Sequence, residues 1–278
     1  MKPATLNEII EYSRKQSVGV GMFNIVNLEF AQAIFNASQS TGLPVLFGMP
    51  ERFFLFYDGA AMALVCQKMI RDSKTPVAIH LDHGKSFDGV IAALKAGFSS
   101  VMFDGSALEY EENVAQTAEI VKIAHSFGIS VEGELGYVGR VGVDTADSEG
   151  FTRPDQAEDF VKRTGVDALA IAIGNLHGVY KGEPKLDFER IKAIRAKVGD
   201  CGLVLHGGSG ISDEDFRHAI RCGINKINIY TAMDVAVKDF NNAHFNEYET
   251  YLDYTKALVP VVEKVVADYM LLFASAKK

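Results

Sequence analysis

The segment PVAIHLDHG (residues 76–84) is a short apolar run that ends in His80, Asp82 and His83. Similar runs recur along the whole chain, and each is followed by a longer stretch with helical periodicity. The predicted strands begin near residues 18–23, 44–47, 76–79, 100–103, 129–132, 168–173, 203–205 and 224–228. Eight such units predict an α/β fold, a parallel (β/α)8 TIM barrel, with a doubly wound open sheet as the alternative.

Composition bounds the class of protein. The 278 residues carry a formal net charge of −8 without a run of Lys or Arg, so we expect no nucleic-acid or membrane partner. Cys66, Cys201 and Cys222 are scattered, which argues against a disulfide framework or a thiolate zinc site. The apolar runs are far shorter than the roughly 18 residues that span a bilayer. We expect a cytoplasmic small-molecule enzyme with one domain over residues 1–278.

Two segments stand outside the repeat. Residues 135–154 are Gly-rich, polar and without periodicity, which is typical of a functional loop such as a lid. Residues from 241 onward predict a C-terminal helical extension after the eighth unit, and such an extension could form an oligomer contact.

Polar side chains end almost every predicted strand. In a (β/α)8 barrel the chemistry lies at the C-terminal ends of the strands. The residues at those ends are Asn24, Asp82, His83, Asp104, Glu132, Glu134, Asn175, His177, His206, Asn228 and Thr231. The second strand runs into FGMPERFF (residues 47–54) and ends without an acid, imidazole or amide.

Three histidines indicate a metal site. His83, His177 and His206 end three different strands, and side chains from separate strands that converge on one mouth match the three-imidazole geometry of a catalytic zinc. The alternative for each is a hydrogen-bonded histidine of the core or rim. His80 is expected to support a ligand rather than to be one.

Three carboxylates surround this site. Asp82 can act as a general base toward a substrate that the metal polarises; the alternative is an acceptor that orients a ligand histidine. Asp104 and Glu134 add negative charge and indicate a second cation position, with capping or salt bridging as their alternative.

The segment HGGSGISDED (residues 206–215) is a Gly-rich turn that runs into a helix. Backbone N–H groups of Gly207, Gly208 and Ser209 could face an anion there, where barrels often hold phosphate. Thr231 follows strand eight and Lys181 follows strand six. The sequence therefore predicts a substrate that carries a phosphate close to the metal.

These segments together resemble the class II, zinc-dependent fructose-1,6-/tagatose-1,6-bisphosphate aldolase family. The resemblance runs from about Leu6 to Pro260. It is carried by FNIVNLEF (23–30), HLDHG (80–84), SVMFDGS (100–106), VEGELG (131–136), RTGVDALAIAIGNLHGVYKGEPKLDF (163–188), LHGGSGI (205–211) and INKINIYT (224–231).

The resemblance implies a role for each matching residue. His83, His177 and His206 would bind Zn²⁺, Glu134 and Asp104 would lie at a buried or second metal position, and Asp82 would move the proton at the carbon–carbon bond. The phosphate of dihydroxyacetone phosphate would be held by Gly178, Lys181, Gly207, Ser209 and Thr231, and Asn228 would contact the enediolate. Asn24 and Gly208 complete the expected substrate site.

Family members also use a monovalent cation (Na⁺ or K⁺) near the phosphate and form homodimers or homotetramers. No Lys ends a predicted strand, which disfavours the Schiff-base route of metal-free aldolases.

The sequence departs from the family on the other half of the substrate. The family's Ser-x-Gly-Ala turn is replaced by Pro50-Glu51-Arg52-Phe53, and its Asp-Pro-Arg by Asp253-Tyr254-Thr255. In the family's bisphosphate aldolases that serine and arginine bind the distal phosphate. We therefore predict that the aldehyde is not the usual phosphorylated triose.

Two further positions bear on the aldehyde. Arg52 could clamp a carboxylate, a sulfonate or a repositioned phosphate if it points inward; the alternative is a solvated loop arginine. Tyr230 stands where the family has Asp or Ala, near the hydroxyls of the cleaved bond. The loop also lacks the family's acidic Gly-Gly-x-Glu-Asp segment, and Asp144, Asp147 and Glu149 are the candidates to replace it.

The sequence thus predicts a zinc-dependent class II aldolase that reversibly cleaves a ketose 1-phosphate to dihydroxyacetone phosphate and a neutral, carboxylated or sulfonated aldehyde. A conventional fructose-1,6- or tagatose-1,6-bisphosphate aldolase is the closest alternative. A zinc-dependent hydrolase of a sugar phosphate and a sugar-phosphate binding protein without catalysis are the alternatives of other classes.

Overall fold

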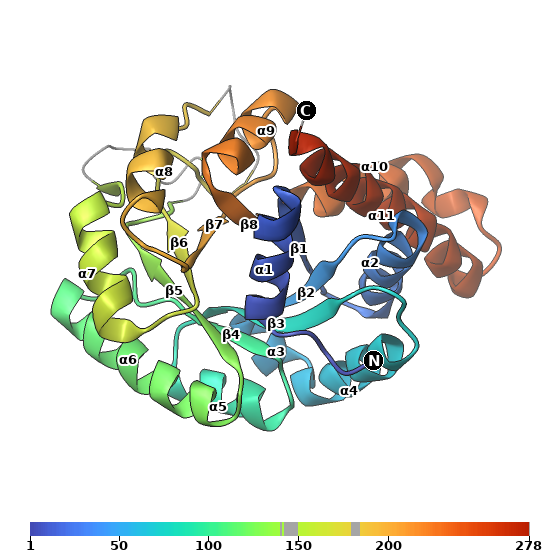
Figure 1. Cartoon of the computed structure of the whole chain (residues 1–278). Coiled ribbons are helices and arrows are strands. Elements are labelled where there is room, and N and C mark those ends of the chain that lie inside the picture. The colour runs from blue at the N-terminus through green and yellow to red at the C-terminus, as the bar shows by residue number, and fades with distance from the viewer. Residues whose placement is uncertain (140, 142–149, 179–183, 278) are drawn as a thin grey trace.

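The computed structural model describes residues 1–139, 141, 150–178 and 184–277. Eight parallel strands form a closed barrel in the order β1-β2-β3-β4-β5-β6-β7-β8, and helices surround it (Figure 1). The predicted (β/α)8 TIM barrel is confirmed, and the open sheet is excluded because β1 pairs with both β2 and β8.

The strands lie where the apolar runs predict them. They are β1 Val20–Asn24, β2 Val45–Pro50, β3 Val77–Gly84, β4 Ser100–Phe103, β5 Ser130–Leu135, β6 Ala168–Ile171, β7 Gly202–Leu205 and β8 Ile224–Ile229. Each observed start is within two residues of the predicted one. The third strand includes residues 77–84 of the segment PVAIHLDHG, so the polar end of that segment is part of the barrel wall.

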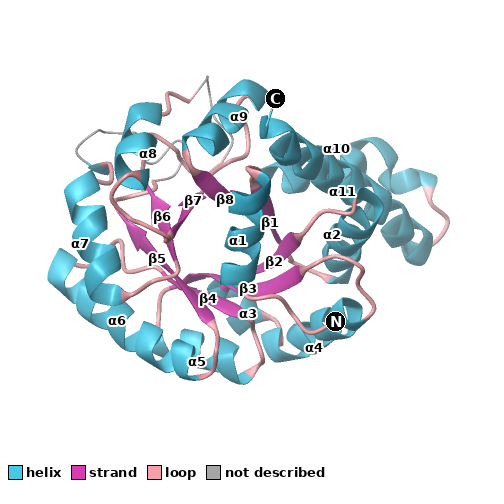
Figure 2. Cartoon of the chain, in the orientation of Figure 1, coloured by secondary structure: helices cyan, strands magenta, loops and turns pink. Residues whose placement is uncertain are grey.

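Helices follow the strands around the barrel (Figure 2). They are α1 Leu6–Gln16, α2 Leu28–Thr41, α3 Glu51–Phe56, α4 Gly59–Arg71, α5 Phe87–Lys95, α6 Tyr110–Ser126, α7 Pro154–Thr164, α8 Phe188–Arg195, α9 Asp213–Cys222, α10 Thr231–His244 and α11 Tyr251–Ala274. Side-chain caps fix several starts; for example, Asn27 accepts the N–H of Phe30 and Ser212 accepts that of Asp215.

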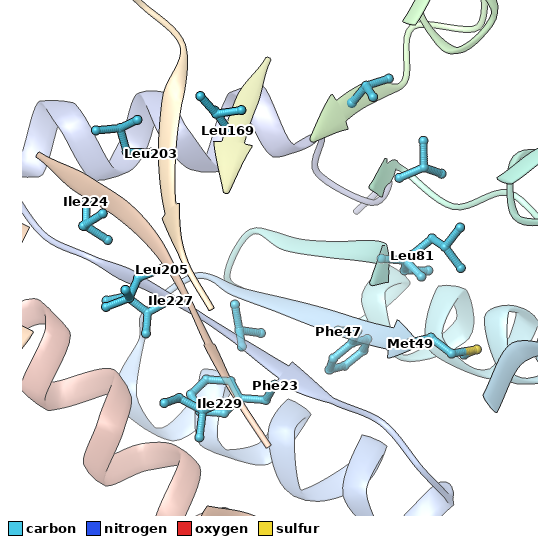
Figure 3. Packing of buried hydrophobic residues seen from close by; sticks show 14 of the residues in the cluster. Phe23, Phe47, Met49, Leu81, Leu169, Leu203, Leu205, Ile224, Ile227 and Ile229 are labelled. Carbon is cyan, nitrogen blue, oxygen red and sulfur yellow. The ribbon is translucent and has the colours of Figure 1, made fainter. Parts of the chain in front are cut away.

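The barrel wall has two apolar faces. Outward side chains such as Phe23, Phe47 and Leu81 pack beneath the helices (Figure 3). Inward side chains near the N-terminal ends of the strands, such as Met22 and Leu46, pack against α1, which closes that end of the barrel. Because alternate residues of a strand face opposite sides, the polar inward residues are left for the other end.

The C-terminal helical extension is also confirmed. Helix α11 packs along α2 and against α10 (Figure 1). No described helix combines the length and apolar character needed to cross a bilayer. The assignment of residues 1–278 to a single domain stays a prediction.

Candidate active site

Polar side chains fill the interior of the barrel toward the C-terminal ends of the strands. Along β3, β5 and β8, strand alternation turns His80, Glu132 and Lys226 inward, and all three are fully buried. His80 Nδ1 lies 2.8 Å from Ser100 Oγ, and its Nε2 lies 3.6 Å from Glu132 Oε2. His80 is thus hydrogen-bonded to Ser100 below the mouth, which is consistent with the prediction that it supports a metal ligand rather than being one.

His83 reaches the mouth because β3 is irregular. In a regular strand Asp82 and His83 would point to opposite faces. The register between β3 and β4 shifts between Leu81 and Gly84, and His83 has φ 49°, in the left-handed region that non-glycine residues rarely adopt. The shift places both side chains at the same mouth, and a strained backbone of this kind is a mark of functional sites.

The three predicted zinc histidines come together. The ligand nitrogens of His83, His177 and His206 lie within 4.8 Å of one another, and His83 Nε2 is 3.1 Å from His206 Nδ1. His177 follows β6 and is held by backbone hydrogen bonds from its N–H to Gly139 O (2.8 Å) and from Val141 N–H to its carbonyl (2.9 Å). Three imidazoles at this spacing could hold a zinc ion with a position left for substrate.

A second group shares His83. One ligand atom each of His83, Asp104 and Glu134 also lies within 4.8 Å of the others. Asp104 Oδ2 is 2.9 Å from His83 Nδ1, whereas Glu134 Oε2 is buried without a hydrogen-bond partner among the described residues. A buried carboxylate oxygen left without a donor is costly, so this atom fits a place beside a cation.

Asp82 is held as an acceptor between two amides. Its Oδ2 accepts from Asn24 Nδ2 (2.9 Å) and its Oδ1 from Asn228 Nδ2 (3.0 Å). Burial alone would raise the pKa of Asp82, but the nearby imidazoles and the Lys226 ammonium lower it below its ordinary value. The group is therefore a carboxylate at neutral pH, as a general base must be.

Backbone geometry shapes the predicted phosphate side. Gly207 has φ 65°, and a Cβ there would collide with the carbonyl of Leu176. Ser209 Oγ accepts the N–H of Ala232 (3.1 Å), which joins the Gly-rich turn to the start of α10 at Thr231. Gly208 packs against the carbonyl of Asn228, where a Cβ would lie 3.0 Å from that oxygen.

The remaining predicted positions lie in the segments that follow β5 and β6. Gly178 has φ 113° and follows His177. Lys181, Asp144, Asp147 and Glu149 lie outside the described residues, as do residues 140 and 142–149 of the predicted lid.

Arg52 is not buried in the barrel. It is exposed on α3, with its guanidinium carbon 5.0 Å from the centre of the Phe53 ring. Phe53 in turn meets Tyr230 edge-on, with ring centroids 6.5 Å apart. Arg52, Phe53 and Tyr230 therefore form an aromatic and cationic rim, in which the side chain of Arg52 is exposed.

Sequence reasoning missed three residues of the site region. Glu51 is buried, and its carboxylate accepts from Lys85 N–H (2.8 Å) and from Ser86 Oγ, which fastens α3 to the loop after β3. Glu132 was noted only as a strand end. Lys226 was not noted, although its spacing of two from Asn228 places both on the inward side of β8. Asn175, at a predicted strand end, bonds backbone groups of Ile173 and His206.

Comparisons with known proteins agree with this geometry. The chain matches the family model described as fructose-bisphosphate aldolase class-II over residues 4–278. It is 41% identical to a fructose-bisphosphate aldolase of Staphylococcus aureus strain Mu50 over 273 residues, which cover 95% of this chain and 94% of that one. A probable fructose-bisphosphate aldolase of Bacillus subtilis strain 168 is 40% identical over 257 residues, 90% of each chain.

A solved structure is similar over nearly the full length. The crystal structure of the YdjI aldolase from Escherichia coli K12 has a TM-score of 0.89 and 34% identity, and the match covers 99% of this chain and 98% of that one.

Proposed function

Because this chain belongs to the class-II fructose-bisphosphate aldolase family and is therefore a lyase, we propose that it uses bound Zn²⁺ to cleave a ketose 1-phosphate or ketose bisphosphate reversibly to dihydroxyacetone phosphate and an aldehyde. One observation carries this proposal. His83, His177 and His206 lie within 4.8 Å of one another beside a carboxylate, Asp82, that two amides hold in place.

The donor set fits zinc. Three imidazole nitrogens are the ligands of many catalytic zinc sites, and the buried Glu134 oxygen supports a second cation position next to Asp104. When bound, Zn²⁺ would polarise the substrate carbonyl and stabilise the negative charge that develops on its oxygen. A monovalent cation (Na⁺ or K⁺) near the phosphate is part of the proposal through the family resemblance.

Metal binding should release a proton from His83. Burial would lower the pKa of His83, but Asp82, Asp104 and Glu134 raise it to about 9 in the metal-free protein. Zinc binds the neutral imidazole, so we expect close to one proton released per zinc at pH 7, and an apparent zinc affinity that rises about tenfold per pH unit up to pH 9.

Calorimetric titration with zinc in buffers of different ionisation enthalpy measures this release. Equal heats in all buffers at pH 7 would contradict the assigned pKa. The stability of the metal-free fold depends on pH in the opposite direction to the zinc affinity. Because the pKa of His83 is raised above its ordinary 6.5, its protonated form stabilises the fold fully below pH 6.5, and that contribution is lost as the pH rises through about 9.

Asp82 would carry the proton. With dihydroxyacetone phosphate bound, its carboxylate would remove a proton from the carbon that forms the new bond, and in cleavage it would return a proton to that carbon. Asn228 would donate a hydrogen bond from its amide to the oxygen that gains charge. Asn24 and Asn228 keep the Asp82 carboxylate oriented, since each donates to one of its oxygens.

The phosphate would lie on the glycine-rich side of the mouth. The phosphate could approach the backbone closely at Gly178, Gly207 and Gly208, which have no side chain. The N-terminus of α10 at Thr231 offers positive potential to the anion. Ser209 positions this turn, and Lys181 would add a cation.

The aldehyde would meet the rim of Arg52, Phe53 and Tyr230. The family's serine and arginine for a distal phosphate are replaced here, and Thr255 sits on α11 with its hydroxyl bonded to Leu252 O. A neutral, carboxylated or sulfonated aldehyde is therefore our proposal. A conventional fructose-1,6- or tagatose-1,6-bisphosphate aldolase is the second candidate, supported by the similarity to the Staphylococcus and Bacillus fructose-bisphosphate aldolases.

A condensation screen decides between these candidates. Zinc-loaded enzyme and dihydroxyacetone phosphate would be offered neutral, carboxylated, sulfonated and phosphorylated aldehydes. If an anionic non-phosphate aldehyde is preferred, Arg52→Met should raise its KM about tenfold or more, because a hydrogen bond to a charged group contributes roughly 1.5–3 kcal/mol. Arg221→Met, at an exposed arginine of α9 that pairs with Glu214, is the matched control. A clear preference for glyceraldehyde 3-phosphate would refute the substrate proposal.

The chain would act as a homodimer or homotetramer. Exposed apolar side chains gather at the end of α3, on the residue that follows it, and at the start of α11, and such side chains support an interface between copies. They are Leu55, Phe56, Tyr57, Tyr251 and Leu252.

A further inference from the structure

Lys226 is a fully buried lysine inside the barrel. It lies on β8 between Val20 of β1 and Val204 of β7. Its Nζ donates to Glu132 Oε2 and to Asn228 Oδ1, each at 2.8 Å. Glu132 belongs to β5, which does not neighbour β8, so this ion pair crosses the barrel interior beneath the mouth.

Stability alone does not explain this ion pair. Removing two charges from water costs several kcal/mol per ion, and apolar replacements of similar volume are often neutral or stabilising. An ammonium offers only donors, however, so whatever bonds to Lys226 must present an acceptor. Lys226 therefore dictates how its two partners are turned.

On the metal side, Lys226 acts through Glu132. The second oxygen of that carboxylate, Oε1, lies 2.8 Å from His206 Nε2. Since the Glu132 carboxylate is held as an acceptor, the proton of the neutral His206 ring sits on Nε2. Its Nδ1, 3.1 Å from His83 Nε2, then keeps a lone pair directed at the space between the three imidazoles.

On the base side, Lys226 acts through Asn228. Because the Asn228 carbonyl oxygen must face the ammonium, its amide nitrogen faces Asp82, where it donates to Oδ1 at 3.0 Å. With the amide turned over, Asn228 would present an oxygen to the Asp82 carboxylate, which is repulsive. The same cation thus orients a group on each side of the site.

We propose that Lys226 is a positioning residue: through Glu132 it fixes the His206 tautomer that can bind metal, and through Asn228 it fixes the donor that faces Asp82. The metal half of this proposal rests on the proposed zinc site. Lys226 is not a Schiff-base nucleophile, because its nitrogen is enclosed and already bonded to two partners.

A pair of variants tests the metal half. In Glu132→Gln the new amide must give its oxygen to Lys226, so its nitrogen faces His206 Nε2. His206 Nε2 must then accept a hydrogen bond from the amide nitrogen, and the ring proton of His206 moves to Nδ1. In the double variant Glu132→Gln/Lys226→Met the amide is free to turn its oxygen to His206, which restores the proton on Nε2. A residue that served only packing would give no such rescue.

Two readouts follow these variants. Long-range ¹H–¹⁵N NMR of the imidazoles in metal-free protein, with the His206 signal assigned by its loss in His206→Gln, should show Nε2–H in the parent, Nδ1–H in Glu132→Gln and Nε2–H again in the double variant. Zinc affinity, measured by competition with a chelator, should fall about 10–100-fold in Glu132→Gln and largely recover in the double variant. Lys238→Met, at an exposed lysine paired with Asp234 on α10, should change neither readout.

The base half is tested by Lys226→Met alone. In this variant the Asn228 amide loses its contact to Lys226 and keeps the one to Asp82, so kcat should fall at least about tenfold while KM stays within a few-fold. This variant also keeps the proposal testable if Glu132→Gln fails to fold.

The proposal is overturned if Glu132→Gln keeps Nε2–H, if the double variant is no better than the single one, or if Lys226→Met keeps full kcat. Should the parent protein bind no zinc at the three histidines, the proposed function fails, while the NMR result still decides the role of Lys226 in setting the tautomer.

Discussion

Asp82→Ala should reduce the cleavage rate by about 10²–10⁴-fold, the usual contribution of a positioned general base. The carboxylate is buried, deprotonated and oriented by Asn24 and Asn228, and it lies at the mouth that the three histidines share. In the variant, zinc and phosphate binding should be retained, because none of the proposed zinc or phosphate ligands is removed.

Hydrogen exchange gives the sharper measurement. The parent protein should exchange a proton of dihydroxyacetone phosphate with D₂O without any aldehyde present, and Asp82→Ala should lose most of that exchange as followed by ¹H NMR. Asp88→Ala, at an exposed carboxylate of α5, is the matched control. Full exchange in Asp82→Ala would remove Asp82 from the proposed role.

Removing the metal should abolish activity, with a loss of about 10³-fold or more, because the ion supplies several kcal/mol of charge stabilisation that the described side chains do not replace. Added Zn²⁺ should restore the activity of the parent protein after chelation. His206→Ala should not recover, since it lacks one of the three converging nitrogens.

The control for this loss is His125→Ala. His125 is half-exposed on α6 and pairs with Asp167 at 2.8 Å, away from the three imidazoles. It should keep its zinc, measured by elemental analysis, and its activity. Activity that survives complete chelation would contradict a metal-dependent aldolase.

The fold and much of the site could be predicted because both follow from periodicity. Eight apolar runs with helical segments between them specify the barrel, and parallel strands gather their C-terminal ends at one mouth. The convergence of His83, His177 and His206 follows from that topology without knowledge of any side-chain contact.

The sequence could not show how individual side chains are turned. Strand alternation predicts that Asp82 and His83 face opposite sides, and only the register shift at Leu81 to Gly84 brings them together. The Lys226–Glu132 pair joins strands that are not neighbours, so neither spacing nor periodicity reveals it. The exposed position of Arg52 depends on where α3 begins, and the buried Glu51 carboxylate helps to fix that start by accepting the N–H of Lys85, 34 residues along the chain.

Product analysis after zinc reconstitution tests most directly whether the protein is a zinc-dependent aldolase. Metal-free protein would receive one equivalent of Zn²⁺ and then a ketose 1-phosphate or ketose bisphosphate, and the products would be followed by NMR. We expect zinc-dependent breakage of a carbon–carbon bond, with dihydroxyacetone phosphate and an aldehyde formed in equal amounts. Release of inorganic phosphate with the carbon chain intact would identify a hydrolase and contradict it.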